Sequence, residues 1–273
     1  MPENLIIATC QHPIHAQVNK NLSFIRKQIL EANARGADIV HFSECNLSGY
    51  AGEEFDSVDK KNFGNVQNAL MQICELAGKL NIWVIVGSHH FENGVRKPNN
   101  SLHLINDKGL IINRYDKRLL YGAPGEMEHK HYSPGTKPVV FRINGIECGL
   151  LICHEWRYPE LYREYYKKKV KVLFQSWYDG NLSSELYRKE GKELGELITG
   201  TVKGNAANNY LWISASNNSR KESSFPAFVA QPDGKTHQKL TRNRAGVLIS
   251  RIDPGQVFPD PSSHNRDRTI RKC

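Results

Sequence analysis

Short apolar runs that are rich in β-branched residues alternate with amphipathic helical segments along this chain. Residues 5–11 form the first apolar run, and the segment 19–35 follows it with apolar side chains at helical spacing. Gly36 then provides a helix stop. This alternation predicts an α/β fold. The further segments expected to be strands are 37–43, 82–87, 101–105, 110–115, 139–143, 147–152, 170–174, 211–215, 227–230 and 246–251, and those expected to be helical are 66–80, a segment that begins near Pro159, and 184–209, which its glycines interrupt.

Tight-turn signals indicate that the sheets are not purely parallel. The segment 106–109 and the pair Asn144-Gly145 each separate two apolar runs, and Asp233-Gly234 marks a further turn. Such short turns join antiparallel strands, whereas parallel strands need long crossovers. The sequence therefore predicts mixed sheets. Two sheets, each covered by helices on its outer face, would accommodate this many strands.

The chain is long enough for one large domain that needs no disulfide or metal to stabilise it. A domain of 273 residues buries about 70–75% of the surface of its unfolded chain. We therefore expect a single domain over residues 1–273. The segment 254–273 is polar, and we expect it to be a loop-like tail that frays or lies on a partner subunit.

The formal net charge of +9 raises the question of nucleic-acid binding. The Lys and Arg residues are spread out, however, and the densest clusters, 167–169 and 266–272, are not interleaved with aromatic residues. No apolar run approaches the roughly 20 residues of a membrane helix, and residues 1–4 lack the basic segment of a signal peptide. We expect binding to neither nucleic acid nor membrane; a solvated basic surface or a preference for acidic small molecules fits the charge better.

The six cysteines are scattered and form no C-x-x-C pair, which argues against zinc sites of that type. Cys10, Cys74 and Cys148 lie inside apolar runs, where reduced core thiols are common. Reduced, unpaired cysteines are typical of a cytoplasmic protein.

Three polar residues follow apolar runs and could carry chemistry: Glu44, Lys117 and Cys153. Active sites in α/β proteins favour the carboxyl ends of strands. A thiol in such a place can be a nucleophile, a partly desolvated carboxylate can be a general base, and a lysine can stabilise an oxyanion. Taken singly, each residue also has an ordinary explanation as a buried structural cysteine, a solvated strand-end glutamate or a basic loop residue.

The order and surroundings of these residues resemble the nitrilase, or carbon–nitrogen hydrolase, superfamily. Glu44 lies in S-E-C-N-L-S-G-Y, which is similar to the family's P-E-x-x-x-x-G-Y. Lys117 ends Y-D-K, which is similar to Y-R-K. Cys153 lies in I-C-H-E-W-R-Y-P-E, which is similar to I-C-Y-D-x-R-F-P-E and is the most specific of the three motifs. The resemblance covers nearly the whole chain.

The resemblance implies a four-layer α-β-β-α sandwich that assembles as a homodimer and hydrolyses small amides or N-carbamoyl amines without a metal or organic cofactor. It implies that Glu44 takes the proton of Cys153, and that the thiolate forms a thioester acyl-enzyme. Lys117 and the backbone N–H of His154 would stabilise the oxyanion.

Further site residues follow from the resemblance. The family often has a second glutamate before its S-P-G motif, which here is 133–135. Glu126 and Glu128 are the two candidates, and the spacing favours Glu128. The candidate substrate-binding residues, by analogy of position, are Tyr50, His154, Trp177 and Tyr178.

The chain departs from the family pattern at several positions. Ser43 stands where the family commonly has Pro, and His154 follows the nucleophile. Asn205 and Asn208 stand where the family's R-A-x-E-N motif has Arg and Glu. We expect these two changes to affect helix packing or the subunit contact rather than the chemistry.

Three alternatives remain open. A nitrile-cleaving member is one, and a non-catalytic or regulatory binding protein on the same fold is another, although the intact Glu44, Lys117 and Cys153 argue against the latter. A metal-dependent hydrolase is the third, but no H-E-x-x-H spacing occurs, and adjacent histidines on a strand point to opposite faces. The residues considered for metal binding are His89, His90, His129, His131, His154 and Glu155.

Overall fold

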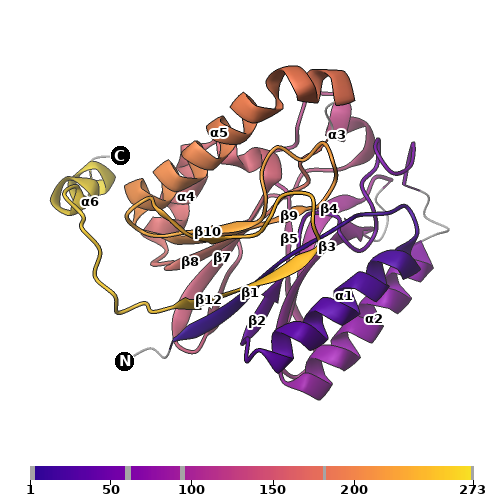
Figure 1. Cartoon of the computed structure of the whole chain (residues 1–273), viewed down its shortest axis with the longest axis horizontal. Coiled ribbons are helices and arrows are strands. Elements are labelled where there is room, and N and C mark those ends of the chain that lie inside the picture. The colour runs from indigo at the N-terminus through magenta and orange to yellow at the C-terminus, as the bar shows by residue number, and fades with distance from the viewer. Residues whose placement is uncertain (1–3, 59–62, 93–95, 181–182, 272–273) are drawn as a thin grey trace.

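Two β-sheets lie face to face between two layers of helices (Figure 1), and a short parallel pairing of Gln11 and His12 with Asn217 and Asn218 joins the two sheets at one edge. The computed structural model describes residues 4–58, 63–92, 96–180 and 183–271. The elements in chain order are β1 (Leu5–His12), α1 (Val18–Ala34), β2 (Ile39–His41), α2 (Phe63–Leu80), β3 (Trp83–His90), β4 (Asn99–Ile105), β5 (Ile111–Asp116), α3 (Met127–His131), β6 (Val140–Ile143), β7 (Ile146–Ile152), the 3₁₀ helix η2 (Cys153–Arg157), α4 (Pro159–Lys167), β8 (Val172–Ser176), α5 (Ser184–Asn209), β9 (Trp212–Asn218), β10 (Phe228–Ala230), β11 (Thr236–Lys239), β12 (Gly246–Ile252) and α6 (Ser263–Arg271).

Both sheets are mixed, as the turn signals predicted. In the first sheet β1, β2 and β3 are parallel, while β12 and β4 flank them antiparallel and β5 pairs with β4. In the second sheet β7, β8 and β9 are parallel, while β6 and β10 flank them antiparallel and β11 pairs with β10. Asn144 and Gly145 both have positive φ, at 49° and 78°, which suits the tight turn between β6 and β7.

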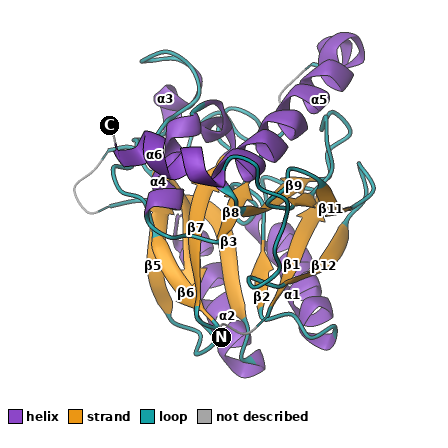
Figure 2. Ribbon diagram, turned by 90° about the vertical axis from the view of Figure 1, so that its left-hand side faces the viewer, coloured by secondary structure: helices purple, strands orange, loops and turns teal. Residues whose placement is uncertain are grey.

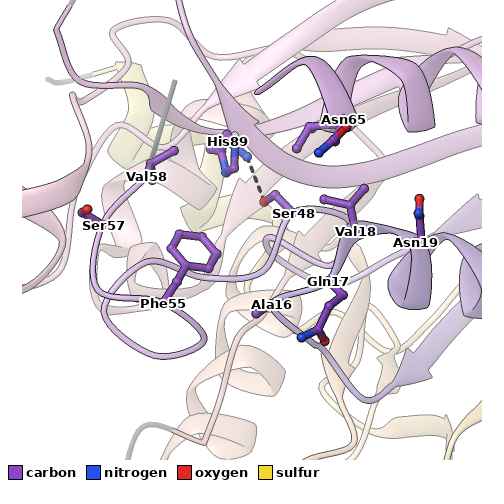
Figure 3. Close-up of a pocket in the computed structure, with 11 residues that line it drawn as sticks. Ala16, Gln17, Val18, Asn19, Ser48, Phe55, Ser57, Val58, Asn65 and His89 are labelled. Atoms are coloured by element: carbon purple, nitrogen blue, oxygen red, sulfur yellow. Dashed lines mark hydrogen bonds between the residues drawn. The ribbon is translucent and has the colours of Figure 1, made fainter. Parts of the chain in front are cut away.

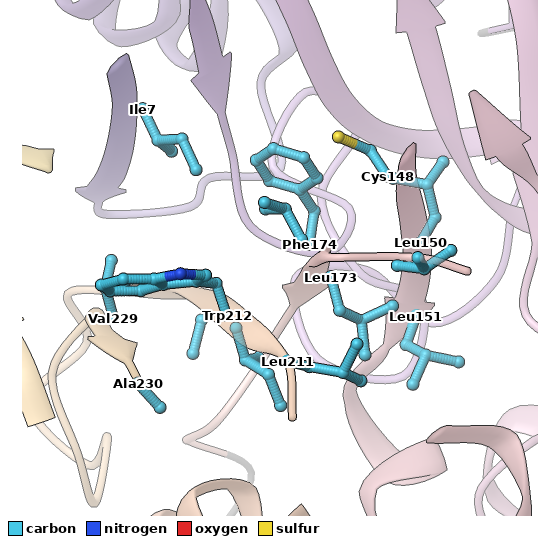
Figure 4. Close-up of a cluster of buried hydrophobic side chains, with 14 of the residues drawn as sticks. Ile7, Cys148, Leu150, Leu151, Leu173, Phe174, Leu211, Trp212, Val229 and Ala230 are labelled. Atoms are coloured by element: carbon cyan, nitrogen blue, oxygen red, sulfur yellow. The ribbon is translucent and has the colours of Figure 1, made fainter. Parts of the chain in front are cut away.

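Successive side chains of a strand point alternately into two hydrophobic cores, one between the two sheets and one between a sheet and its helices. Ile7 of β1 belongs to the cluster between the sheets, together with Phe174 of β8 (Figure 4). Ala8, the next residue, belongs to the cluster under α1 and α2, which Ile25 and Ile73 help to form. This two-residue period is the expected behaviour of strands buried on both faces. The predicted α-β-β-α sandwich is confirmed.

Helix α5 is continuous over Ser184–Asn209, although its glycines led us to expect interruptions. One of these glycines has a packing role. A Cβ atom on Gly195 would lie 2.4 Å from the carbonyl oxygen of Ser224, so only glycine lets the helix approach that loop so closely. The glycine therefore allows tertiary packing to sustain a helix that propensity alone disfavours.

The C-terminal tail is not simply loop-like, and this expectation was wrong. Residues Ser263–Arg271 form α6, which lies beside α4 (Figure 2). The Arg266 guanidinium donates to the carbonyl oxygen of Asn208 at 2.8 Å and lies over the rings of Tyr166 and Tyr210. Asp267 also accepts a hydrogen bond from the Tyr166 hydroxyl at 2.6 Å. Because these polar contacts attach the helix to α4 and α5, hydrophobic periodicity could not reveal it. Residues 272–273 of the expected tail lie outside the described residues.

None of the helices in the described parts of the chain combines the length and the apolar character needed to cross a membrane.

Candidate active site

Ends of strands from both sheets bring the predicted catalytic residues together. Glu44 lies three residues after β2, and Lys117 directly follows β5, both in the first sheet. Cys153 directly follows β7 of the second sheet and begins η2. Glu128 comes from the short helix α3. The structure therefore assembles the site from four segments that are far apart in the sequence.

Lys117 lies between two buried carboxylates. Its Nζ atom is 2.9 Å from Oε1 of Glu44 and 2.8 Å from Oε2 of Glu128. All three side chains are almost completely buried, at 1% exposure or less. One ammonium between two carboxylates leaves a net negative charge in a low-dielectric place, where ionic interactions are strong. Glu126, the other candidate for the second glutamate, is exposed.

Asn100, on β4, connects the two carboxylates and was not predicted. Its Nδ2 donates to Oε1 of Glu44 at 2.7 Å and to Oε1 of Glu128 at 3.0 Å. The remaining carboxylate oxygens accept backbone N–H groups, from Tyr178 at 2.9 Å for Glu44 and from Tyr121 at 2.6 Å for Glu128. The sequence did contain a signal for this role, namely an asparagine at the start of an apolar strand. A buried amide in such a place requires hydrogen-bond partners.

Cys153 has a left-handed backbone conformation, with φ at 39°. That conformation costs a non-glycine residue roughly 1–2 kcal/mol and is often found at functional sites. The half-buried thiol lies 3.7 Å from the carbonyl oxygen of Tyr178. Burial and the nearby Glu44 carboxylate raise the pKa of the thiol, although Lys117 opposes this. The thiol is therefore protonated at rest and needs a base.

Burial also raises the pKa of Glu44, which favours its action as a proton acceptor. Lys117 and the hydrogen bond from Asn100 lower it, and Glu128 raises it. For Glu128 the ion pair with Lys117 and the hydrogen bonds outweigh the effect of burial, so its pKa is lowered. The two carboxylates therefore differ: Glu128 stays ionised beside Lys117, and Glu44 is the one able to exchange a proton.

Glu155 fixes the segment of Lys117 to the segment of Cys153. Its fully buried carboxylate accepts from the backbone N–H of Arg118 at 2.8 Å and of Ile152 at 2.7 Å, and from the Tyr115 hydroxyl at 2.8 Å. It thus connects the end of β5 in the first sheet to the end of β7 in the second sheet. Sequence reasoning considered Glu155 only as a metal ligand, although a carboxylate two residues after the nucleophile was a visible signal.

A cavity of about 480 Å³ opens beside the thiol. All four candidate substrate-binding residues line it, as do Lys117, Glu128 and Cys153. The rings of Tyr50 and Tyr178 stack with centroids 4.6 Å apart. The candidates are Tyr50, His154, Trp177 and Tyr178, and the wall is completed by apolar residues that include Trp156, Leu194 and Ile198.

The histidines considered for metal binding are dispersed. His131 and His154 line the cavity at Cys153, whereas His89 lines a separate hollow of about 450 Å³ with Ser48 and Phe55 (Figure 3). Within residues 4–58, 63–92, 96–180 and 183–271, no three His, Cys, Asp or Glu side chains are grouped in a way that could hold a metal ion.

Curated proteins are similar to this chain over much of its length. The nitrilase homolog 2 of Dictyostelium discoideum is 26% identical over 211 residues, which are 75% of this chain and 60% of that protein. The 2-oxoglutaramate amidase of Bacillus subtilis strain 168 is 27% identical over 150 residues, 54% of each chain. The matches thus span little more than half the length of these curated relatives.

Solved structures show the same fold. An amidase from Nesterenkonia sp. superposes with a TM-score of 0.76 at 19% identity, covering 100% of this chain and 97% of the amidase chain. Residues 6–259 match the carbon-nitrogen hydrolase family. Since this match takes in every strand and the strand ends that carry Glu44, Lys117 and Cys153, the chain belongs to the carbon–nitrogen hydrolase family.

Proposed function

We propose that this protein hydrolyses the carbon–nitrogen bond of a small amide or N-carbamoyl amine through a thioester on Cys153. The observation that carries the proposal is that Lys117 and Glu128 line the same cavity as the Cys153 thiol, with Glu44 paired to Lys117 directly behind them. Together these residues provide a base, a fixed cation and a nucleophile, which are the three functions that acyl transfer needs.

In the first half of the reaction, the Glu44 carboxylate accepts the thiol proton of Cys153. The thiolate attacks the carbonyl carbon, and the carbonyl π electrons move to the oxygen. Lys117 and the backbone N–H of His154 stabilise that oxyanion. Glu44 then gives its proton to the leaving nitrogen, the carbon–nitrogen bond breaks, and ammonia or an amine departs from the thioester.

In the second half, Glu44 accepts a proton from water, and the resulting hydroxide attacks the thioester carbon. The second tetrahedral intermediate collapses, the carbon–sulfur bond breaks, and the acid product leaves. Glu44 returns its proton to the Cys153 thiolate. Glu128 and Asn100 take no proton in this scheme. They hold Lys117 and Glu44 in place, because Lys117 donates to Glu128 and Asn100 donates to both carboxylates.

An amide is favoured over a nitrile because several of the curated relatives with stated activities are named as amidases. A nitrile would form a thioimidate on Cys153 and would need an added water and the loss of ammonia to reach the same thioester. A non-catalytic role is less consistent with the site, because a buried Lys with two carboxylates is costly to maintain.

Intact-mass spectrometry tests the proposal. The protein is incubated with a panel of small amides and N-carbamoyl compounds at saturating concentration and quenched in acid. We expect an added acyl mass on Cys153, loss of that mass in Cys153→Ala, and no loss in Cys148→Ala, a buried cysteine on β7 remote from the cavity lining. Full activity of Cys153→Ala toward any substrate would disprove the thioester mechanism.

We also propose that residues 1–273 form one domain that assembles as a homodimer in the cytoplasm. The five described cysteines are unpaired, as is usual in a reducing compartment. A hollow of about 740 Å³ lies between α4, α5 and the start of α6. Asn205, Asn208 and Arg163 are among the residues that line it, and we propose that this hollow contributes to the contact with the second subunit. A monomer in multi-angle light scattering would contradict the dimer.

A further inference from the structure

One acidic residue on the wall of the active-site cavity has no part in the proposed chemistry. Asp179 follows Tyr178, is 8% exposed, and lines the same cavity as Cys153. Burial raises the pKa of its carboxyl group, and hydrogen bonds oppose this. A carboxylate buried in such a place must be compensated, either by hydrogen bonds or ion pairs within the protein or by a ligand.

The hydrogen bonds of Asp179 explain only one of its carboxylate oxygens. Oδ2 accepts from the backbone N–H and the hydroxyl of Ser224, the latter at 2.8 Å, and from the hydroxyl of Ser223 at 3.3 Å. The backbone N–H of Phe225 also interacts with the carboxyl group and lowers its pKa. In the hydrogen-bond geometry of the described residues, Oδ1 itself has no donor, yet it is not among the buried polar atoms without a partner. Oδ1 is therefore the oxygen accessible from the cavity. The serines fix the carboxylate and leave one face of it available.

The other carboxylates near the cavity each have a lysine or arginine within ion-pair distance, whereas Asp179 has none in the described parts of the chain. Glu44 and Glu128 share Lys117, and Glu53 and Glu54 lie 3.6 Å and 3.3 Å from the Arg220 guanidinium. No lysine or arginine in the described ranges forms an ion pair with Asp179. Asp179 is thus a buried negative charge that lacks a counter-ion on the cavity wall.

We propose that Asp179 binds a protonated amino group of the substrate, so that the protein prefers amides or N-carbamoyl compounds that carry a second, cationic amine. This inference rests on the proposed hydrolase function and specifies its substrate class. The aromatic rings of Tyr50, Trp177 and Tyr178 line the same cavity and add cation–π attraction. Lys130 and Arg157 also line it, but both are exposed, where water and salt screen their repulsion.

The chain connectivity limits the length of the substrate. The Cys153 thiol lies 3.7 Å from the carbonyl oxygen of Tyr178, and Asp179 is the next residue. Standard bond lengths then place the Asp179 carboxylate no more than roughly 10 Å from the sulfur. Two to four methylene groups between the scissile carbonyl and the ammonium would span that gap.

Three amides of matched length test the proposal: 4-aminobutanamide is cationic, pentanamide is neutral and glutaramate is anionic. We expect the wild-type protein to show a kcat/KM at least tenfold higher for the cationic amide than for the neutral one. Asp179→Asn, which keeps the shape and removes the charge, should lower this ratio at least tenfold. Glu53→Gln removes a carboxylate that lines the same cavity but is exposed and already paired with Arg220, so the ratio should change less than twofold.

Equal kcat/KM for the cationic and neutral amides in the wild type would overturn the proposal, whether or not Asp179→Asn folds. So would a preference for glutaramate that persists in Asp179→Asn, because the exposed cations would then select the substrate. Binding separates this failure from failure of the hydrolase function. If no amide is turned over, binding of 4-aminobutanamide can still be measured by isothermal titration. Cys153→Ala/Asp179→Asn should bind it at least tenfold more weakly than Cys153→Ala does. Equal binding to the two would overturn the inference.

Discussion

The ammonium of Lys117 lies 2.9 Å from Oε1 of Glu44, and both side chains are sealed from solvent. A buried ion pair of this kind is expensive to break, because removal of one partner leaves an uncompensated charge in the interior. The same pair would supply both the base and the oxyanion cation of the proposed reaction. Stability and activity are therefore tied to the same atoms.

Substitution of Lys117 should affect both properties. Lys117→Met leaves Glu44 and Glu128 facing each other without a cation, and we expect a loss of about 3–5 kcal/mol in the free energy of unfolding. Loss of an oxyanion donor should also lower kcat by about 10²–10³-fold. Urea unfolding and initial rates check the two effects. Lys130→Met, an exposed lysine on the same cavity, should stay within about 0.5 kcal/mol of wild type; a similar loss in both variants would contradict the role of the buried pair.

The two candidate glutamates can be distinguished directly. Glu128→Gln removes the charge 2.8 Å from Lys117, and the displaced ammonium should lower kcat by about 100-fold. Glu126→Gln changes an exposed side chain two residues away and should leave kcat unchanged. Steady-state kinetics on the substrate that acylates Cys153 provide the measurement. Equal effects of the two substitutions would show that Glu128 does not position the lysine.

The hydrogen bond from Asn100 to Glu44 should affect the pH at which kcat/KM rises on the acid side of the pH–rate profile. Its hydrogen bond lowers the pKa of Glu44, against the larger effect of burial. Glu44 accepts a proton only as a carboxylate, so kcat/KM rises with pH as this group ionises. In Asn100→Ala the pKa of Glu44 is higher, and the acid limb should move to higher pH.

The neighbouring asparagine is a matched control for this experiment. Asn99 donates to the carbonyl oxygen of Ser133 at 2.9 Å and makes no contact with either carboxylate. Asn99→Ala should therefore keep the wild-type pH profile even where it lowers stability. If Asn100→Ala reduced the rate by the same factor at every pH, its role would be structural and not electrostatic.

Buried histidines should make the fold sensitive to acid. Burial lowers the pKa of His103 from 6.5 to about 3, so the unfolded chain takes up a proton at a pH where the folded chain does not. This contribution to stability is complete above pH 6.5 and is lost as the pH falls, by about 1.4 kcal/mol at pH 5.5. Glu44 and Glu155, whose folded pKa values are raised, have the opposite sign, so a difference between variants is the appropriate measurement.

Urea unfolding at pH 7 and pH 5.5 isolates the histidine effect. The loss of stability between the two pH values should be smaller in His103→Gln than in wild type by about 1.4 kcal/mol. His264→Gln alters an exposed histidine on α6 and should keep the wild-type loss. An unchanged loss in His103→Gln would mean that His103 already carries its proton in the folded protein.

Local patterns in the sequence determined most of the elements. The two-residue and helical periods located the described strands other than β11 and most of the helices, and Asn144-Gly145 specified its hairpin, because these signals act between neighbours in the chain. They missed β11 and α6, and they located α5 but wrongly predicted interruptions in it. In α5 the glycines are tolerated, and Gly195 packs closely on Ser224. In α6 polar contacts of Arg266 and Asp267 attach the helix to its neighbours.

The site residues also fall into those that the sequence revealed and those that only the tertiary structure revealed. The residues around Cys153, Glu44 and Lys117 were recognisable from motifs, each of which is a short segment at a strand end. The spacing to the S-P-G motif already favoured Glu128 over Glu126. The ion pair of Glu128 with Lys117, the bridging amide of Asn100 and the accessible carboxylate of Asp179 depended on the tertiary structure. Each of these is a relationship between side chains from different strands and loops, and only the packing of the two sheets brings them within hydrogen-bond distance.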